Sequence, residues 1–127
     1  MDELESALSE GEWDLLQVLW DDGPAAASQV ATALEESRGW ARTTVKTLLD
    51  RMAAKGLVKT RRVGNVVEYS AAVDPATARR TAWRRFVDLA FDGSLSPALE
   101  FLVRDAKLTP KQRARLSALL EEVDHDN

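Results

Sequence analysis

Residues 42–55 constrain the fold of this chain more than any other segment, because apolar and polar side chains separate there onto two sides of a helix. The apolar positions are Val45, Leu48, Leu49 and Met52. Their helical spacing predicts a helix with one buried side. The opposite side would carry Thr43, Lys46, Thr47 and Asp50, with Thr44 and Arg51 beside them. The pattern predicts a helix that packs firmly on one side and offers small polar and cationic groups on the other.

Two shorter helices are predicted before this segment and a hairpin after it. Ser9 and Glu12 have the spacing of a capping box at the start of the first helix, and the second would run from Ser28 to about Glu36. Two strand-like runs, residues 57–62 and 66–70, are joined around Gly64-Asn65. Three helices followed by a hairpin are the order of a winged helix-turn-helix, whose third helix lies in the major groove of DNA while the hairpin contacts the backbone.

The C-terminal part is predicted to form three more helices, each beginning at a polar residue followed by proline. The starts and approximate ends are Asp74-Pro75 to Asp92, Ser96-Pro97 to Asp105, and Thr109-Pro110 to Val123. Residues 124–127 would form a frayed tail. We therefore expect a mainly α fold with a small β-hairpin. It would consist of a winged-helix DNA-binding domain over residues 1–73 and a helical region over residues 74–127.

The last three helices carry more apolar side chains than about 45 residues can bury within one chain. A second copy would bury them, so this part is predicted to be a dimerisation region. A monomer that folds these side chains back on the winged helix is the alternative. A symmetric dimer predicts a palindromic site with half-sites about one helical turn (~10 bp) apart, or a multiple of it. The predicted dimerisation residues are Trp83, Phe86, Val87, Phe91, Leu99, Leu102, Val103, Leu116, Leu119 and Leu120.

Charge is unevenly distributed along the chain, although the net charge is only −4. Residues 1–36 have ten acidic side chains and no basic ones, whereas residues 37–85 have twelve Lys or Arg against three acidic residues. A basic middle segment can focus a positive potential on one face, which is what phosphate binding requires. A solvated surface of mixed charge is the alternative.

The third predicted helix and the hairpin offer the chemistry of DNA recognition. Threonine hydroxyls can hydrogen-bond to base edges and their methyl groups can touch a thymine methyl, while Arg and Lys neutralise phosphates. The predicted DNA-binding residues are Arg42, Thr43, Thr44, Lys46, Thr47, Arg51, Arg61 and Arg62. The alternative function is a winged helix that binds protein and not DNA, whose binding would not depend on Lys46 and Arg51 or on salt.

No catalytic or metal-binding constellation accompanies these features. The chain has no cysteine, which excludes disulfides, thiolate zinc sites and cysteine nucleophiles. Its one histidine, His125, lies between two aspartates and is interpreted as a spacer. There is no glycine-rich phosphate loop and no nucleophile–base pair, so we expect no enzyme, no metal and no cofactor. Neither a signal peptide nor an apolar stretch approaching 18 residues is present, so we expect no membrane contact and a cytoplasmic location.

Several stretches of this sequence match, in order and spacing, the pattern of one known protein family. The first is residues 8–13, Leu-Ser-Glu-Gly-Glu-Trp, followed by Val18-Leu19-Trp20. The second is residues 40–52, which contain the threonine-bearing helix, followed by Lys55-Gly56. Tyr69-Ser70 and residues 91–94, Phe-Asp-Gly-Ser, also match. Together these stretches resemble the penicillinase repressor family, the BlaI, MecI and CopY type of transcriptional regulator. The resemblance covers about residues 7–123, with its pieces in the order and at the spacing of the family.

The resemblance implies a homodimeric repressor that binds dyad-symmetric operators of resistance or stress genes. It implies base contacts from Thr43, Thr44 and Thr47, positions near bases or phosphates for Lys46 and Arg51, and backbone contacts from Arg61 and Arg62. Copper-responsive relatives sense metal through a cysteine cluster, and a chain without cysteine excludes that mechanism.

This chain departs from the family pattern at three places. Ala41-Arg42 stands where many relatives have Ser-Pro at the start of the recognition helix, and Asn65 stands where a basic residue is common at the hairpin tip. The resemblance also implies a sensor or protease partner, because relatives that respond to β-lactams are cut at an Asn-Phe bond. The corresponding regulatory position here is Glu100-Phe101, so the family's cleavage rule does not carry over directly.

Four arginines on the fourth predicted helix fall outside these assignments: Arg79, Arg80, Arg84 and Arg85. We interpret them as a solvated face that can pair with the acidic first helix. Contact with DNA that flanks the binding site is the alternative.

Overall fold

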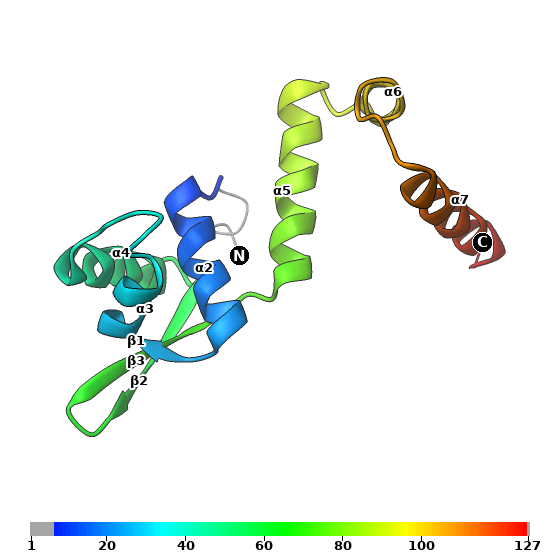
Figure 1. The fold of residues 1–127 in the computed structure, drawn as a ribbon. Coiled ribbons are helices and arrows are strands. Elements are labelled where there is room, and N and C mark those ends of the chain that lie inside the picture. Colours follow the sequence, from blue (N-terminus) through cyan, green and yellow to red (C-terminus); the bar gives the residue numbers. More distant parts are fainter. Residues whose placement is uncertain (1–6, 127) are drawn as a thin grey trace. The chain divides into compact units, whose positions relative to one another are not determined.

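The computed structural model describes residues 7–126 and shows helices with a small antiparallel sheet (Figure 1). The N-terminal elements are α2 (Glu10–Asp22), β1 (Ala25–Ala26), α3 (Ala27–Ala33), α4 (Arg42–Ala54), β2 (Val58–Val63) and β3 (Val66–Ala71). The elements that follow are α5 (Pro75–Ala90), α6 (Leu95–Asp105) and α7 (Pro110–Asp126). This order confirms the predicted mainly α fold with a winged helix-turn-helix.

Contacts divide the chain into two compact units, Met1–Arg85 and Phe86–Asn127. The first unit has a hydrophobic core to which all its helices and strands before α5 contribute. The core residues with the lowest exposure are Leu15, Leu16, Val30, Val45, Leu49, Met52, Leu57 and Tyr69. Since α2, α3, α4 and β3 all supply members of this set, the core fixes how these elements lie against one another.

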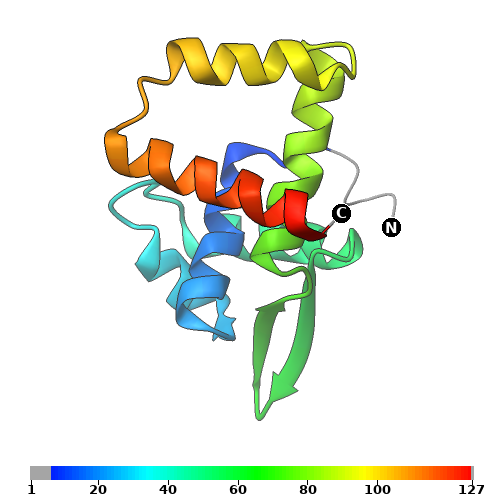
Figure 2. The ribbon, with the colours of Figure 1, turned by 90° about the vertical axis from the view of Figure 1, so that its right-hand side faces the viewer.

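The sheet has the strand order β1-β3-β2 within the described residues. Strands β2 and β3 form the predicted hairpin, with Val63 paired to Val66 and only Gly64 and Asn65 between them. Gly64 has a φ of 63°, a left-handed conformation that glycine adopts without steric cost. Figure 2 shows the hairpin as an arm that extends away from the helices of this unit. The two-residue strand β1 pairs with β3 and was not predicted, because two alanines carry no strand signal of their own.

Local start signals predicted most helix boundaries correctly. Ser9 caps α2 in a complete capping box with Glu12, and Asp74 accepts a hydrogen bond from the Thr77 backbone at the start of α5. Thr109 and Gln112 form a capping box before α7, in which each side chain accepts a hydrogen bond from the backbone N–H of the other residue. Helix α3 is shorter than predicted, because residues 34–38 form turns.

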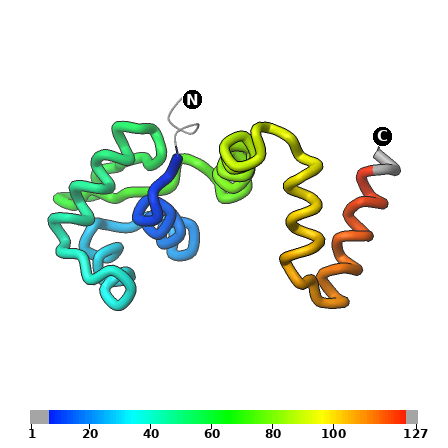
Figure 3. The backbone as a smooth tube through the Cα atoms, turned by 90° about the horizontal axis from the view of Figure 1, so that it is seen from above, coloured from blue at the N-terminus to red at the C-terminus, as the bar shows by residue number. Residues whose placement is uncertain are grey.

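Two predicted boundaries in the second unit were wrong. Helix α6 begins at Leu95 after the N-cap residue Ser94, so Pro97 lies inside its first turn. A first-turn residue needs no N–H for the helix, which is why proline fits there as well as at the first position. Helix α7 continues to Asp126 in place of the frayed tail predicted from residue 124, and Asn127 lies outside the described residues. Figure 3 shows that the chain reverses direction between α6 and α7.

Candidate nucleic-acid interface

Helix α4 is held by one side and leaves the other open, as its sequence pattern predicts. Val45 and Leu49 are fully buried and Met52 is 1% exposed. The opposite side of the helix is exposed, and its members are Arg42, Thr43, Thr44, Lys46, Thr47, Asp50 and Arg51. The helix has no side-chain N-cap, since Ala41 stands at that position. Its orientation therefore depends on contacts with neighbouring elements.

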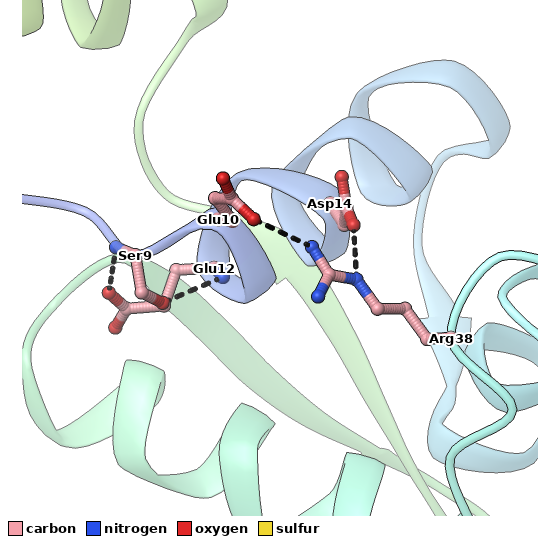
Figure 4. A network of polar contacts seen from close by, with 5 residues as sticks. All are labelled: Ser9, Glu10, Glu12, Asp14 and Arg38. Atoms are coloured by element: carbon pink, nitrogen blue, oxygen red, sulfur yellow. Dashed lines mark hydrogen bonds and ion pairs between the residues drawn. The ribbon is translucent and has the colours of Figure 1, made fainter.

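The segment before α4 is attached to α2 by Arg38. The Arg38 Nε lies 2.6 Å from the Asp14 carboxylate, and a second guanidinium nitrogen lies 3.9 Å from Glu10 (Figure 4). The guanidinium also lies 5.2 Å from the ring centre of Trp40, within the range of a cation–π contact. Trp40 in turn packs closely on α2, because a Cβ at Gly11 would come within 2.9 Å of the indole. These contacts fix where the exposed helix begins.

The end of α4 is attached to α2 by Glu12, a residue of α2. Its Oε1 accepts the Ser9 backbone N–H at 2.9 Å, and its Oε2 accepts a bond from Lys55 Nζ at 2.9 Å. Burial alone would raise the pKa of the Glu12 carboxyl, but the hydrogen bonds from Ser9 and Lys55 outweigh burial and lower that pKa. One carboxylate therefore caps α2 and ties the C-terminus of α4 to it.

A third attachment joins the middle of α4 to the hairpin. The Tyr69 hydroxyl of β3 donates to Asp50 Oδ1 at 2.6 Å, and Lys46 Nζ lies 2.8 Å from Asp50 Oδ2. The bonds from Lys46 and Tyr69 lower the pKa of Asp50, while burial and the bond to Asp50 raise the pKa of Tyr69. Because the tyrosine side chain is almost completely buried, it fixes Asp50, and Asp50 holds the lysine.

These attachments divide the basic middle segment into two groups. Arg38 and Lys55 pair with acidic residues of α2, so part of the charge separation along the chain is used inside the fold. In the part of the chain that the structure describes, no carboxylate pairs with Arg42, Arg51 or Arg62. Arg42 and Arg51 on the exposed side of α4 and Arg62 on β2 are therefore among the cations that stay available for a ligand.

The predicted threonines come together on the exposed side of α4. Thr43, Thr44, Thr47 and Arg51 line one shallow depression with Leu48. The Thr47 hydroxyl donates to the Thr43 carbonyl at 2.9 Å. With its proton committed in this way, the Thr47 oxygen is an acceptor and its methyl group is free for apolar contact. This surface is small, polar and flanked by cations.

The two predicted hairpin arginines lie on opposite faces of β2, because neighbouring strand residues alternate in direction. Arg61 is opposite Glu68 and pairs with it at 3.2 Å. Arg62 is opposite Val67 and so shares the face of the hairpin on which Tyr69 contacts α4. The hairpin therefore directs Arg62, and not Arg61, toward the side of α4.

Residues of the second unit expose a large apolar surface. Exposed members of the predicted dimerisation set there are Phe86, Leu99, Leu102, Val103, Leu119 and Leu120, while Val87 is buried and Phe91 and Leu116 are partly buried. Trp83, which precedes this unit, is 45% exposed. Glu100 and Phe101, which the resemblance predicts to stand at the family's cleaved bond, lie on α6. There Glu100 is 3.9 Å from Arg104, and the Phe101 ring contacts Phe91.

Metal-ligand clusters and membrane-spanning helices are both absent from the described residues. Among them, no group of three His, Cys, Asp or Glu side chains is arranged to hold a metal ion. Nor does any helix within residues 7–126 combine the length and apolar character needed to cross a membrane.

Comparison with known proteins gives a consistent result. The sequence profile described as "Penicillinase repressor" matches residues 8–122. The penicillinase repressor of Bacillus licheniformis is 26% identical over 116 residues, which cover 91% of this chain and 90% of that protein. The methicillin resistance regulatory protein MecI of Mammaliicoccus sciuri is 20% identical over 122 residues, which cover 96% of this chain and 99% of that protein.

One solved structure with a similar fold is the DNA-binding domain of the repressor BlaI. It matches with a TM-score of 0.50 and 24% identity, covering 55% of this chain and 85% of that domain. This likeness concerns the fold, and it supports the winged helix-turn-helix described above.

Proposed function

Because this chain belongs to the penicillinase repressor family, we propose that it is a DNA-binding transcriptional repressor that binds a palindromic operator as a homodimer. The observation that carries the proposal is the exposed, threonine-bearing side of α4, which three sets of contacts hold in one orientation. Repression would follow from occupation of the operator, and we assign the protein no catalytic role. A repressor of this kind would act in the cytoplasm.

Base recognition is assigned to the threonine surface of α4. In the major groove, a threonine hydroxyl can bond to any base edge, and its methyl group can pack against a thymine methyl. Thr47, as an acceptor, is suited to the amino groups of adenine or cytosine. Arg51 lies beside the threonines and can reach a guanine or a phosphate. These four positions are the proposed base-reading set: Thr43, Thr44, Thr47 and Arg51.

Backbone contacts are assigned to the cations around that surface. Arg42 at the start of α4 and Arg62 on the hairpin are exposed and have no carboxylate partner among the described residues. Arg61 pairs with Glu68 on the other face of the hairpin, so its contribution would be smaller. Asn65 at the hairpin tip can donate a neutral hydrogen bond to a phosphate in place of the cation common in relatives.

The helical region is assigned to dimerisation. Phe86, Leu102 and Leu120 are all at least 40% exposed in the single chain, and isolated large apolar patches of this kind mark interaction sites. A second copy offers the same surface, so a two-fold dimer would bury both. It would also present two copies of α4 to half-sites about one helical turn (~10 bp), or a multiple, apart.

Regulation by cleavage would need a protease that accepts Glu100-Phe101. Phe101 is 61% exposed, so a protease can reach its side chain in the single chain. Glu100, however, brings a negative charge to the position where relatives have a neutral asparagine. A protease specific for Asn-Phe would therefore leave this chain intact. A protease partner of this chain would have to accept an acidic residue at position 100.

Selection of bound duplexes from a random library tests the proposed function. We expect enrichment of a palindrome, and affinity for it that falls roughly 10³–10⁵-fold between 50 and 200 mM salt if the dimer neutralises about six to ten phosphates. Recovery of no preferred duplex, together with salt-insensitive binding, would favour a winged helix that binds protein instead.

A further inference from the structure

A groove lies between the start of α4 and the hairpin, and it carries positive charge. Arg42 and Lys46 line it from α4, while Asn65 and Tyr69 line it from the hairpin. Ala26, Ala27 and Ser28 form another part of its wall, and their small side chains leave a volume of about 270 Å³. Among the described residues no acidic side chain lines this groove, although the Asp50 carboxylate is bonded to two residues that do, Lys46 and Tyr69. Its size and charge suit a small anionic group.

The lysine at this groove does not have the freedom of an ordinary surface lysine. Its ammonium lies 2.8 Å from Asp50 Oδ2, and the other oxygen of Asp50 accepts a 2.6 Å bond from the Tyr69 hydroxyl. The tyrosine side chain is 1% exposed, so the far end of this chain of bonds is anchored in the core. One of the three ammonium protons is used by Asp50, which leaves two for another acceptor.

Arg42 and Lys46 occupy a different flank of α4 from the proposed base-reading residues. They are four residues apart and therefore lie one above the other along the helix, facing the hairpin. Thr44 and Arg51 line the separate depression on the other flank. A major groove about 12 Å wide just admits a helix, so side chains on the flank that faces a groove wall can reach the phosphates of that wall.

We propose that the groove between α4 and the hairpin seats one backbone phosphate of the operator in each half-site, with Lys46 as its ligand and with Asp50 and Tyr69 as positioning residues that hold the lysine there. This assignment rests on the DNA binding proposed above and makes it more specific. Lys46 then contributes affinity that does not depend on base sequence, and the threonine flank supplies the discrimination. Holding the side chain before binding reduces the conformational entropy that the complex must lose.

Replacement of single phosphates by neutral methylphosphonates tests the proposal. The duplex would be the palindrome recovered by selection, with one symmetric pair of phosphates replaced at a time, against the wild-type protein and the Lys46→Gln variant. At one symmetric pair of phosphates, we expect neutralisation to weaken binding of the wild-type protein by about tenfold or more. Neutralisation of the same pair should change the affinity of Lys46→Gln little, because this variant already lacks the charge-assisted bond to that phosphate. Arg51→Gln is the matched control, and it should keep the full wild-type penalty at that pair.

Tyr69→Phe tests the positioning role, because it keeps the buried ring and removes the hydroxyl that fixes Asp50. We expect the methylphosphonate penalty at the identified pair to shrink in this variant. A tyrosine with a purely structural role would lower the unfolding midpoint and leave that penalty at its wild-type value.

The outcomes separate this inference from the function on which it rests. If Lys46→Gln binds the palindrome weakly but binds random duplex as the wild type does, Lys46 reads a base and the phosphate assignment is overturned. The phosphate assignment is also overturned if the wild type binds the operator but loses as much affinity as Lys46→Gln at every pair of neutralised phosphates. Failure of the wild type to bind any duplex would instead overturn the proposed function, and this inference with it.

Discussion

Replacing Glu12 by glutamine removes one charge from the contact that ties the end of α4 to α2. Glutamine at this position can still accept the Ser9 backbone N–H, so the capping box survives the change. The bond to Lys55 loses its ionic character. Because the Glu12 side chain is 11% exposed and that of Lys55 is 43% exposed, this bond lies between a surface ion pair and a buried one. We expect a loss of about 1 kcal/mol in the free energy of unfolding at neutral pH.

Two further variants calibrate that value. Glu12→Ala removes the capping bond as well and should cost about 2 kcal/mol, since the loss of a capping interaction typically adds about 1 kcal/mol. Glu10→Gln is the matched control, because the Glu10 side chain is 95% exposed and lies 3.9 Å from Arg38. Its loss should stay below about 0.5 kcal/mol. Urea titrations followed by tryptophan fluorescence measure all three.

The effect of Glu12→Gln should depend on pH with a definite sign. The folded-state pKa of Glu12 lies below its ordinary value of 4.5, so its carboxylate stabilises the fold fully above that value. The stabilisation is lost as the pH falls through the lower, folded-state pKa. Wild type and Glu12→Gln should therefore begin to converge in stability as the pH falls below 4.5, and should converge fully only below the folded-state pKa. A Glu12→Gln loss equal to that of Glu10→Gln at neutral pH, or one that persists undiminished in acid, would refute the reasoning.

Three other changes test separate parts of the account. Thr44→Ala should cost ~1–3 kcal/mol in binding to the selected operator and much less on random duplex, as measured by fluorescence anisotropy; equal losses would remove Thr44 from the base-reading set. Leu120→Glu should convert the dimer to a monomer in analytical ultracentrifugation, since Leu120 is 59% exposed in the single chain; an unchanged mass would place the dimer contact elsewhere. Gly64→Ala forces a side chain into a left-handed turn and should destabilise the hairpin by about 1–2 kcal/mol, seen as faster amide exchange in β2 and β3; unchanged exchange would contradict this.

Local sequence signals predicted much of this fold. The capping box at Ser9 and the Thr109-Pro110 pair before α7 are both complete within four residues, so their helix starts could be predicted without knowledge of distant residues. The same holds for the buried stripe of α4. The start of α6 was misplaced because a serine–proline pair is compatible with more than one position in a first turn.

The contacts that orient α4 could not be predicted in the same way. Lys55 and Glu12 are 43 residues apart, and Asp50 and Tyr69 are 19 apart, so nothing in the sequence near either member identifies its partner. The uneven charge distribution predicts a positive surface for DNA, but it does not identify which cations pair with acidic residues inside the fold. The structure shows that part of that charge, at Arg38 and Lys55, stabilises the fold.

Affinity cleavage tests most directly whether the exposed side of α4 enters DNA in two symmetric copies. The chain has no cysteine, so a single introduced thiol can carry an iron chelate that cuts nearby DNA. Ala54 is exposed at the end of α4, seven residues after Thr47 on the same side, and Ala54→Cys leaves the base-reading residues intact. Gln17→Cys, exposed on α2, is the control. We expect the Ala54 conjugate to cut the selected palindrome at two positions related by its dyad, and the Gln17 conjugate to leave those positions uncut. Cutting from Gln17 but not from Ala54 would contradict the account.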